Sequence, residues 1–258
     1  MKRTLLWLLA VGTIQGALWA APDPFVGKWK LDPSRSKLTD EMKVEPAGDN
    51  RYTFDFGSGN TETIVVDGTD QPGIFETTLA VSAEGPSKWK VVRKKDGHVQ
   101  VTGIWTLSPD GRTLTDEFTG HRADGSVTSL HYVYERTGDG SGFVGTWDST
   151  TEQVNSTYEI EIAPFEEDGL SFITPSQKTT QNLKFDGKDY PASGPNLPEG
   201  FGMSGRRADE RTVDLTSSIR GKVLSTQHVE VSPDLKTLTM TVRPAGSGKP
   251  NVLVFDRE

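Results

Sequence analysis

The pentapeptide Phe25-Val26-Gly27-Lys28-Trp29 decides the fold, because it recurs 118 residues later as Phe143-Val144-Gly145-Thr146-Trp147. Three other landmarks recur in the same order. They are Asp-Gly at 67–68 and 186–187, Ser-Pro-Asp-x-x-Thr-Leu-Thr at 108–115 and 232–239, and the closing triplets Tyr134-Glu135-Arg136 and Phe255-Asp256-Arg257. Because the order is kept while the spacing drifts by a few residues, we infer a tandem duplication whose two copies differ in loop length.

The duplication predicts two domains, over residues 24–137 and 143–258. Between them, Gly-Asp-Gly-Ser-Gly at 138–142 has the composition of a flexible linker. Residues 1–20 precede both units and place a basic start, Lys2-Arg3, before an apolar stretch that ends at Ala20-Ala21. This pattern is typical of a cleaved signal peptide. We therefore expect an exported protein, periplasmic or secreted, with no integral membrane segment in the mature chain.

Apolar and polar residues alternate with a period of two along most of both units. Clear examples are 51–56, 99–107 and 158–162, and turn signals such as Asp96-Gly97 and Asp124-Gly125 separate such runs. Alternation is typical of half-buried strands, because successive side chains leave opposite faces of a sheet. We therefore predict an all-β fold with about eight to ten short strands per unit, arranged as a sandwich or a barrel. The best helical candidate, residues 32–37, is one or two turns long.

The two ends of each unit favour the barrel. Pairing the first strand with the last closes the sheet and removes its exposed edges. In that arrangement the guanidinium of Arg136 lies over the ring of Trp29, and that of Arg257 lies over Trp147. Such a cation–π contact contributes about 1–2 kcal/mol when it is desolvated. The prediction is thus two tandem antiparallel up-and-down barrels, each closed by its own first and last strands.

A Gly-x-Trp in the first strand and an arginine in the last resemble the calycin superfamily of lipocalins, fatty-acid-binding proteins and avidins. The longer set, which adds Asp-Gly-Lys-Asp-Tyr-Pro at 186–191 and the repeated Ser-Pro-Asp segment, is similar to small exported lipocalin-like proteins of acidobacteria. The resemblance covers both units and implies lipocalin-like barrels. The Thr-Asp-Tyr signature of kernel lipocalins is absent.

Several kinds of chemistry find no support in the sequence. The chain has no cysteine and a formal net charge of −8, which disfavours thiolate chemistry and nucleic-acid binding. No Gly-x-Ser-x-Gly elbow or cofactor motif occurs, and Ser34-Arg35-Ser36-Lys37 lacks the companion motifs of a serine–lysine enzyme. The acidic runs 116–117 and 166–168 are expected to be solvated. The histidines lie far from metal-ligand spacing, so no metal is predicted; they are His98, His121, His131 and His228.

What remains is a cavity, because a barrel of this size encloses one small ligand unless side chains fill it. In the first unit the candidate ligand-binding residues are Trp89, Arg93, Trp105 and Tyr134. An inward arginine among aromatic rings requires an anion, which an acidic ligand would supply. The alternative is that the rings are packed core and Arg93 faces water. In the second unit, the segment 189–203 is either a lid at the barrel mouth or an inserted surface loop.

Three functions stay open at this point. The first is an exported protein that binds a small, mostly apolar ligand inside a barrel, without enzymatic activity. The second is an interaction or inhibitor-like module of the envelope or extracellular space that acts through its surface loops. The third is a barrel isomerase or lyase, which would require a strongly perturbed titratable group inside one barrel.

Overall fold

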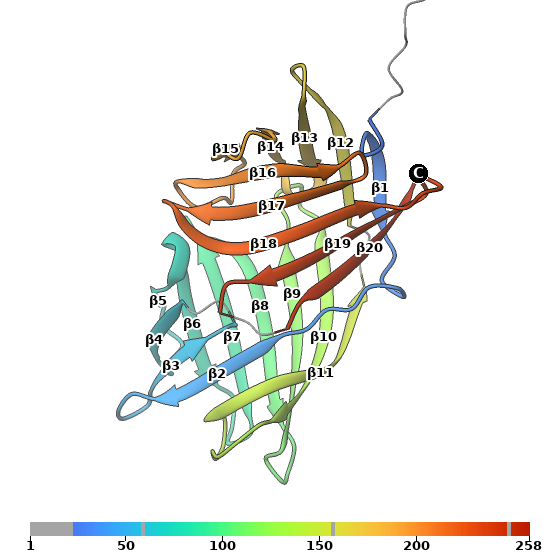
Figure 1. The fold of residues 1–258 in the computed structure, drawn as a ribbon. Coiled ribbons are helices and arrows are strands. Elements are labelled where there is room, and N and C mark those ends of the chain that lie inside the picture. The colour runs from blue at the N-terminus through green and yellow to red at the C-terminus, as the bar shows by residue number, and fades with distance from the viewer. Residues whose placement is uncertain (1–22, 58–59, 156–157, 247–248) are drawn as a thin grey trace, which may run out of the picture.

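The computed structural model describes residues 23–57, 60–155, 158–246 and 249–258, and it consists of two ten-stranded antiparallel sheets (Figure 1). The all-β, two-barrel prediction is therefore confirmed. Two short 3-10 helices, η1 (Ile74–Glu76) and η2 (Pro175–Gln177), interrupt the strands. The helical candidate at 32–37 was wrong: it forms a turn in which the Asp32 carboxylate accepts hydrogen bonds from Ser34. The predicted signal peptide lies outside the described residues.

The first sheet is nearly closed. In spatial order its strands are β4 (Thr61–Val65), β3 (Arg51–Asp55), β2 (Glu41–Pro46), β11 (Gly145–Asn155), β10 (Val127–Arg136), β9 (Thr113–His121), β8 (His98–Leu107), β7 (Lys88–Lys95), β6 (Thr78–Ala83) and β5 (Gln71–Pro72). At the seam between β4 and β5, the side-chain amide of Gln71 accepts from the Val65 N–H at 2.9 Å and donates to the Val65 carbonyl at 2.8 Å. The hydrogen bonds of the Gln71 side chain thus replace the backbone hydrogen bonds that are missing between β4 and β5.

The second sheet is a closed barrel. Around the ring its strands are β1 (Gly27–Leu31), β12 (Glu159–Phe165), β13 (Gly169–Thr174), β14 (Thr179–Lys184), β15 (Tyr190–Ser193), β16 (Phe201–Asp209), β17 (Thr212–Ile219), β18 (Lys222–Val231), β19 (Thr237–Pro244) and β20 (Asn251–Arg257). Closure is made by β1, which pairs with β12 on one side and with β20 on the other. Each barrel encloses its own hydrophobic core.

The two repeats exchange their first strands. Strand β1 of the first repeat completes the second barrel, and β11 of the second repeat lies between β2 and β10 in the first barrel (Figure 1). The predicted domain boundaries are therefore wrong by one strand in each unit. The first barrel is continuous in sequence from β2 to β11, and the second consists of β1 together with β12 to β20.

The exchange also corrects the predicted cation–π pairs. Arg136 lies over Trp147, with its guanidinium carbon 4.2 Å from the ring centroid, and Arg257 lies over Trp29 at 4.1 Å. As predicted, an arginine covers a tryptophan in each barrel, but the arginine and the tryptophan of each pair come from different repeats. Sequence similarity could not reveal this, because the two copies of the first strand are similar enough to occupy either position.

The predicted linker at 138–142 is instead a hairpin loop within the first barrel, between β10 and β11. Arg136 holds it by donating to the carbonyls of Gly142, at 2.6 Å, and of Val144. The connections that do cross between the barrels are those from β1 to β2 and from β11 to β12. Along the first crossing, Lys37 forms a bridge with Val252. This contact fixes the crossing segment against the second barrel.

Candidate ligand-binding site

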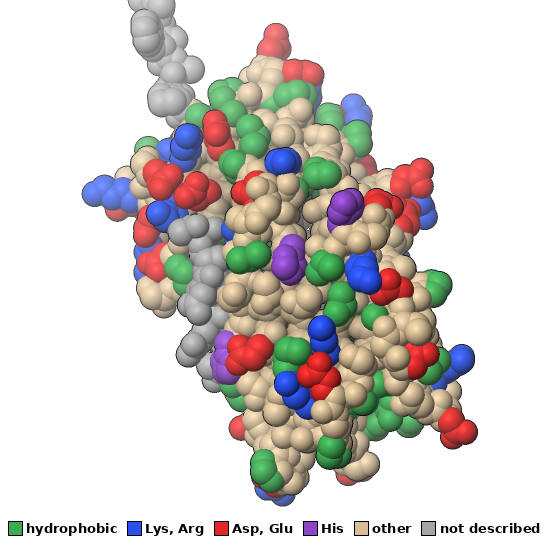
Figure 2. All heavy atoms as spheres, turned by 180° about the vertical axis from the view of Figure 1, so that it is seen from behind, with side chains coloured by type: hydrophobic (Ala, Val, Ile, Leu, Met, Phe, Trp, Pro, Cys, Tyr) green, Lys and Arg blue, Asp and Glu red, His purple; other side chains and the backbone are tan. Residues whose placement is uncertain are grey.

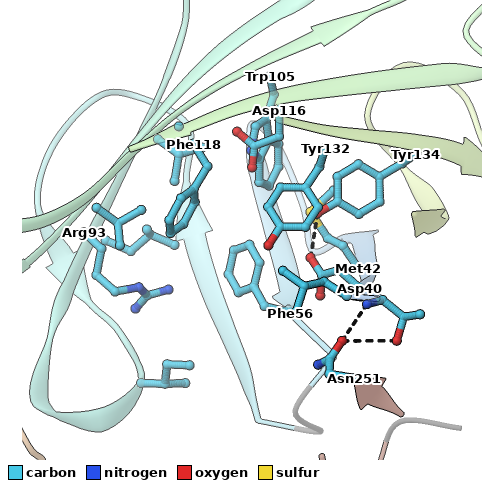
Figure 3. A pocket seen from close by; sticks show the side chains of 17 residues that line it. Asp40, Met42, Phe56, Arg93, Trp105, Asp116, Phe118, Tyr132, Tyr134 and Asn251 are labelled. Carbon is cyan, nitrogen blue, oxygen red and sulfur yellow. Dashed lines mark hydrogen bonds between the residues drawn. The ribbon is translucent and has the colours of Figure 1, made fainter. Parts of the chain in front are cut away.

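The first barrel contains a cavity of about 340 Å³ near its end that faces the second barrel (Figure 3). This volume is at the lower end of the range for small-molecule sites. Its walls combine aromatic rings with a few polar groups. The lining residues are Leu38, Thr39, Asp40, Met42, Phe56, Ile74, Leu79, Val91, Arg93, Val101, Gly103, Trp105, Asp116, Phe118, Tyr132, Tyr134 and Asn251.

Three of the four predicted ligand-binding residues, Arg93, Trp105 and Tyr134, line this cavity. The fourth, Trp89, does not line it. Its ring stacks on Phe143 with centroids 4.0 Å apart and meets Tyr52 edge-on at 5.0 Å. Trp89 is thus part of the packed core, because the segment before β11 brings an additional aromatic ring against it.

Arg93 points into the barrel, so the alternative in which it faces water is wrong. Its side chain is 17% exposed and forms a bidentate ion pair with the Glu62 carboxylate, one contact of which measures 3.1 Å. It also donates to the Thr77 hydroxyl at 2.8 Å. The anion that an inward arginine requires is thus supplied by the protein itself, since a buried charge is tolerated when it is paired and hydrogen-bonded.

Asp116 on β9 is the least satisfied polar group in the cavity. It is 7% exposed, and its Oδ1 accepts no hydrogen bond from the described residues. Burial raises the pKa of the carboxyl to about 7; the nearby Trp105 indole N–H lowers it, and the negative charge of Asp40 adds to the rise. Because Gly103 lacks a Cβ, which would lie 2.9 Å from Oδ1, the backbone leaves room for this carboxylate.

A second carboxyl group, that of Asp40, lies at the cavity wall just before β2. The Tyr134 hydroxyl donates to its Oδ2 at 2.5 Å, and the backbone N–H of Glu41 donates to Oδ1 at 3.0 Å. Burial raises the pKa of Asp40, and burial together with this negative charge raises the pKa of Tyr134. In Figure 3, Asp116 and Asp40 lie beside the tyrosines, on the far side of the Phe56 and Phe118 rings from Arg93.

Most of the charged groups in this cavity are not predicted by the sequence patterns. Asp116 was expected to be solvated as part of an acidic run, yet only its neighbour Glu117 is on the outer face. Alternation contained the signal, because Asp116 shares its strand face with Leu114 and Phe118. Asp40 had no such signal, since it lies on the segment that crosses between the barrels.

The second barrel carries none of these charges. Matching the strand registers of the two barrels places Tyr158 where the first has Asp40, Gln181 for Glu62, Ser217 for Arg93 and Met240 for Asp116. The second barrel closes and packs with neutral residues at all four positions. The charges in the first barrel are therefore not required by the fold.

A smaller cavity of about 240 Å³ lies inside the second barrel, and none of its lining residues is charged. The predicted lid or loop at 189–203 is partly strand, because it contains β15 and the start of β16. Leu197, between these strands, lines the cavity. Its carbonyl accepts a hydrogen bond from Lys95 of the first barrel at 2.9 Å. This segment therefore covers the second cavity and contacts the other barrel.

Both cavities adjoin a cleft of about 410 Å³ between the barrels. Leu38, Val101 and Phe118 line both the cleft and the first cavity. Tyr158 and Leu253 line both the cleft and the second cavity. Both cavities therefore lie next to the same cleft between the barrels.

Comparison with known proteins assigns no family: no protein-family model matches the chain, and no curated protein is significantly similar to it. Within the described ranges, no group of three or more acidic, histidine or cysteine side chains is arranged to hold a metal ion. The described part of the chain also has no helix that is both long and apolar enough to cross a membrane.

Proposed function

We propose that the protein binds a small, mostly apolar molecule in the cavity of the first barrel. The observation that carries this proposal is the unpartnered Oδ1 of Asp116 on the wall of an otherwise largely apolar space. A buried carboxylate without a donor costs free energy, and binding sites commonly combine apolar walls with a few such polar groups. A ligand that supplies the donor would offset that cost.

We also propose that the protein is exported and that it is related to the calycins. Support for export comes from the basic and apolar pattern of residues 1–20. Support for the calycin relationship comes from the Gly-x-Trp strand, whose tryptophan is covered by an arginine in each barrel. The acidic ligand suggested by Arg93 is no longer favoured, because Glu62 already neutralises that guanidinium.

A surface-acting module has less support. On the face shown in Figure 2, acidic and basic side chains are interspersed and hydrophobic ones are scattered among them. The large hydrophobic residues described as exposed lie on separate strands or turns: Val99, Val127, Val223 and Leu235. Extended apolar patches are what mark a docking surface. The segment 189–203 is packed onto the molecule rather than extended from it.

A second candidate function is proton transfer within the same cavity. A carboxyl group whose pKa is near 7 is suited to act as a general base at neutral pH, and Asp116 is such a group. This observation keeps an isomerase or lyase activity open, with Asp116 as the proton acceptor. Exchange of α-protons of bound carbonyl compounds in deuterated water, followed by mass spectrometry, tests it; loss of exchange on Asp116→Asn is the expected result.

Filling the cavity tests the binding proposal. Val91 lines the cavity and is 6% exposed, whereas its neighbour Val92 is on the opposite strand face and does not line it. We expect Val91→Phe to abolish co-purification of a small molecule in native mass spectrometry, and Val92→Phe to leave it intact. A wild-type protein that carries no additional mass when purified from its own host, and whose melting temperature no small molecule in a broad screen raises, would contradict the proposal.

A further inference from the structure

We propose that the ligand of the first barrel carries a positive charge, and that its cationic group, such as a protonated amine, binds between Asp116 and Asp40. This inference rests on the proposed function, since it specifies the chemistry of the same cavity. It concerns the polar end of the ligand, while the apolar body occupies the remaining space.

When Asp40 and Asp116 are ionised, the charges inside the barrel are unbalanced. The structure places three carboxyl groups there, those of Asp40, Glu62 and Asp116, and one guanidinium, that of Arg93. Arg93 is bonded to Glu62 and is separated from the other two carboxyl groups by the Phe56 and Phe118 rings (Figure 3). No lysine or second arginine is among the residues that line the described cavity. A ligand cation supplies the counter-charge that the wall lacks.

Hydrogen bonding points to a donor on the ligand. Tyr134 already gives its hydroxyl proton to Asp40, so it is not free to serve Asp116. The Trp105 indole N–H interacts with the Asp116 carboxyl, but Oδ1 itself still accepts no hydrogen bond from the described residues. An ionised carboxylate accepts hydrogen bonds and donates none, so the open Oδ1 of Asp116 requires an N–H or O–H from outside. An ammonium group has three such donors and a full positive charge, which makes its hydrogen bonds to carboxylates among the strongest.

The aromatic walls are suited to the same occupant. Phe56, Phe118, Trp105 and Tyr132 line the cavity together with the two carboxyl groups. Ring faces attract cations through their quadrupole, with a stronger effect where water is excluded. The formal net charge of −8 also favours the approach of cations over anions.

The second barrel shows which residues occupy the equivalent positions when no acidic groups are present. It has Met240 in place of Asp116 and Tyr158 in place of Asp40, and the Tyr158 ring lies 6.2 Å from that of Phe255, which replaces Tyr134. Since an equivalent fold forms without these acidic groups, their presence in the first barrel points to a ligand rather than to structural need. We therefore expect a cation-selective site in the first barrel and a site for a neutral ligand in the second.

The test uses compounds that differ in their head group alone. Isothermal titration calorimetry of the full-length protein would compare ω-phenylalkylamines, the matching alcohols and the matching carboxylates, with two to six methylene groups. We expect an amine to bind tightest at pH 8. Asp116→Asn should weaken that amine at least about tenfold, as expected for loss of a charge-assisted hydrogen bond, while leaving the alcohols within about twofold.

Glu117→Gln is the matched control, because it removes a negative charge from the adjacent position of the same strand but on the outer face, where Glu117 bonds to His131. Amine affinity should be unchanged in this variant. Unfolding midpoints of both variants verify that each is folded. A second variant, Asp116→Met, installs the residue of the second barrel and should abolish the preference for amines.

The pH profile provides an independent readout. Between pH 8 and 5 the amine stays protonated, so affinity follows the ionisation of the groups around it. Those facing Asp116 are Asp40, Tyr132 and Tyr134 from neighbouring elements and Arg93 across the cavity, while Glu117 adds negative charge from the outer face. The pKa values of Asp40 and Tyr134 are also raised, which keeps the Tyr134 hydroxyl neutral in this range. Affinity for the amine should fall about tenfold per pH unit below pH 7, whereas that of the alcohol should not.

Three outcomes would overturn the inference. If alcohols or carboxylates bind as tightly as amines, or if Asp116→Asn does not change amine affinity, the cation assignment is wrong while binding in the barrel stands. If no compound of the three series binds, the cation assignment fails as well. The proposed function is judged separately, by the mass that co-purifies with wild type and with Val91→Phe.

Discussion

Asp116 shows how a single residue links stability to ligand binding. Its pKa is raised to about 7, above the value near 4 of an exposed aspartate. The folded chain therefore keeps a proton that the unfolded chain releases between pH 4 and 7, and stability falls as pH rises through that range. A buried charge that weakens the fold is consistent with a role in binding rather than in folding.

Removing this charge should stabilise the empty protein at high pH. We expect Asp116→Asn to be more stable than wild type at pH 8 by up to about 4 kcal/mol, since each pKa unit corresponds to about 1.4 kcal/mol. The difference should shrink as pH falls and vanish near pH 4. Urea unfolding at pH 4.5, 6 and 8 measures it, with Glu117→Gln expected to stay within about 0.5 kcal/mol of wild type. A difference independent of pH would show that Asp116 is not the titrating group.

At the scale of single elements, the strands that carry Gly-x-Trp depend on a close approach of arginine to backbone. Gly145 on β11 has φ of +147°, and a Cβ there would lie 2.7 Å from Arg136 Nη1. Gly27 on β1 repeats the arrangement, with φ of +152° and Arg257 Nη1 at 2.6 Å. Glycine is thus needed for both its backbone freedom and its lack of a side chain.

Substitution of Gly145, compared with a control glycine, should separate the effect of backbone strain from that of the arginine contact. We expect Gly145→Ala to destabilise the protein by about 2–4 kcal/mol, because the Arg136 guanidinium must leave the Trp147 ring as well as accept a strained backbone. Gly125→Ala is the control, since Gly125 also has positive φ, +89°, but open space where its Cβ would be. It should cost about 1–2 kcal/mol. Equal losses in urea unfolding would contradict a role for the arginine contact.

The elements themselves could be predicted from sequence far better than their partners. Alternation and turn residues gave an all-β chain of short strands, because these depend on neighbours in sequence. Strand exchange could not be found, because Trp29 and Trp147 are preceded by the same Phe-Val-Gly pattern and fit equally well beside either arginine. The Arg93–Glu62 pair needed knowledge of which strands face each other across the barrel.

At the scale of the whole molecule, the exchange determines which fragments can fold. Residues 38–155 contain all ten strands of the first barrel as one continuous stretch, whereas the sequence repeat 24–137 lacks β11. We expect fragment 38–155 to be a folded monomer. Fragment 24–137 should dimerise by reciprocal exchange of β1, because two copies can then complete each other. Size-exclusion chromatography with light scattering measures both. A monomeric, cooperatively folded 24–137 would show that exchange is not favoured over closure within one repeat.

The chain passes between the barrels twice, once before β2 and once after β11. Two domains joined by a single tether can swivel about it, but a second tether removes most of that freedom. We therefore expect the cleft between the barrels to vary little in width and to limit the size of any molecule that reaches the cavities through it. Ligands would then be selected by size once, at the cleft, and by polarity separately in each of the two cavities.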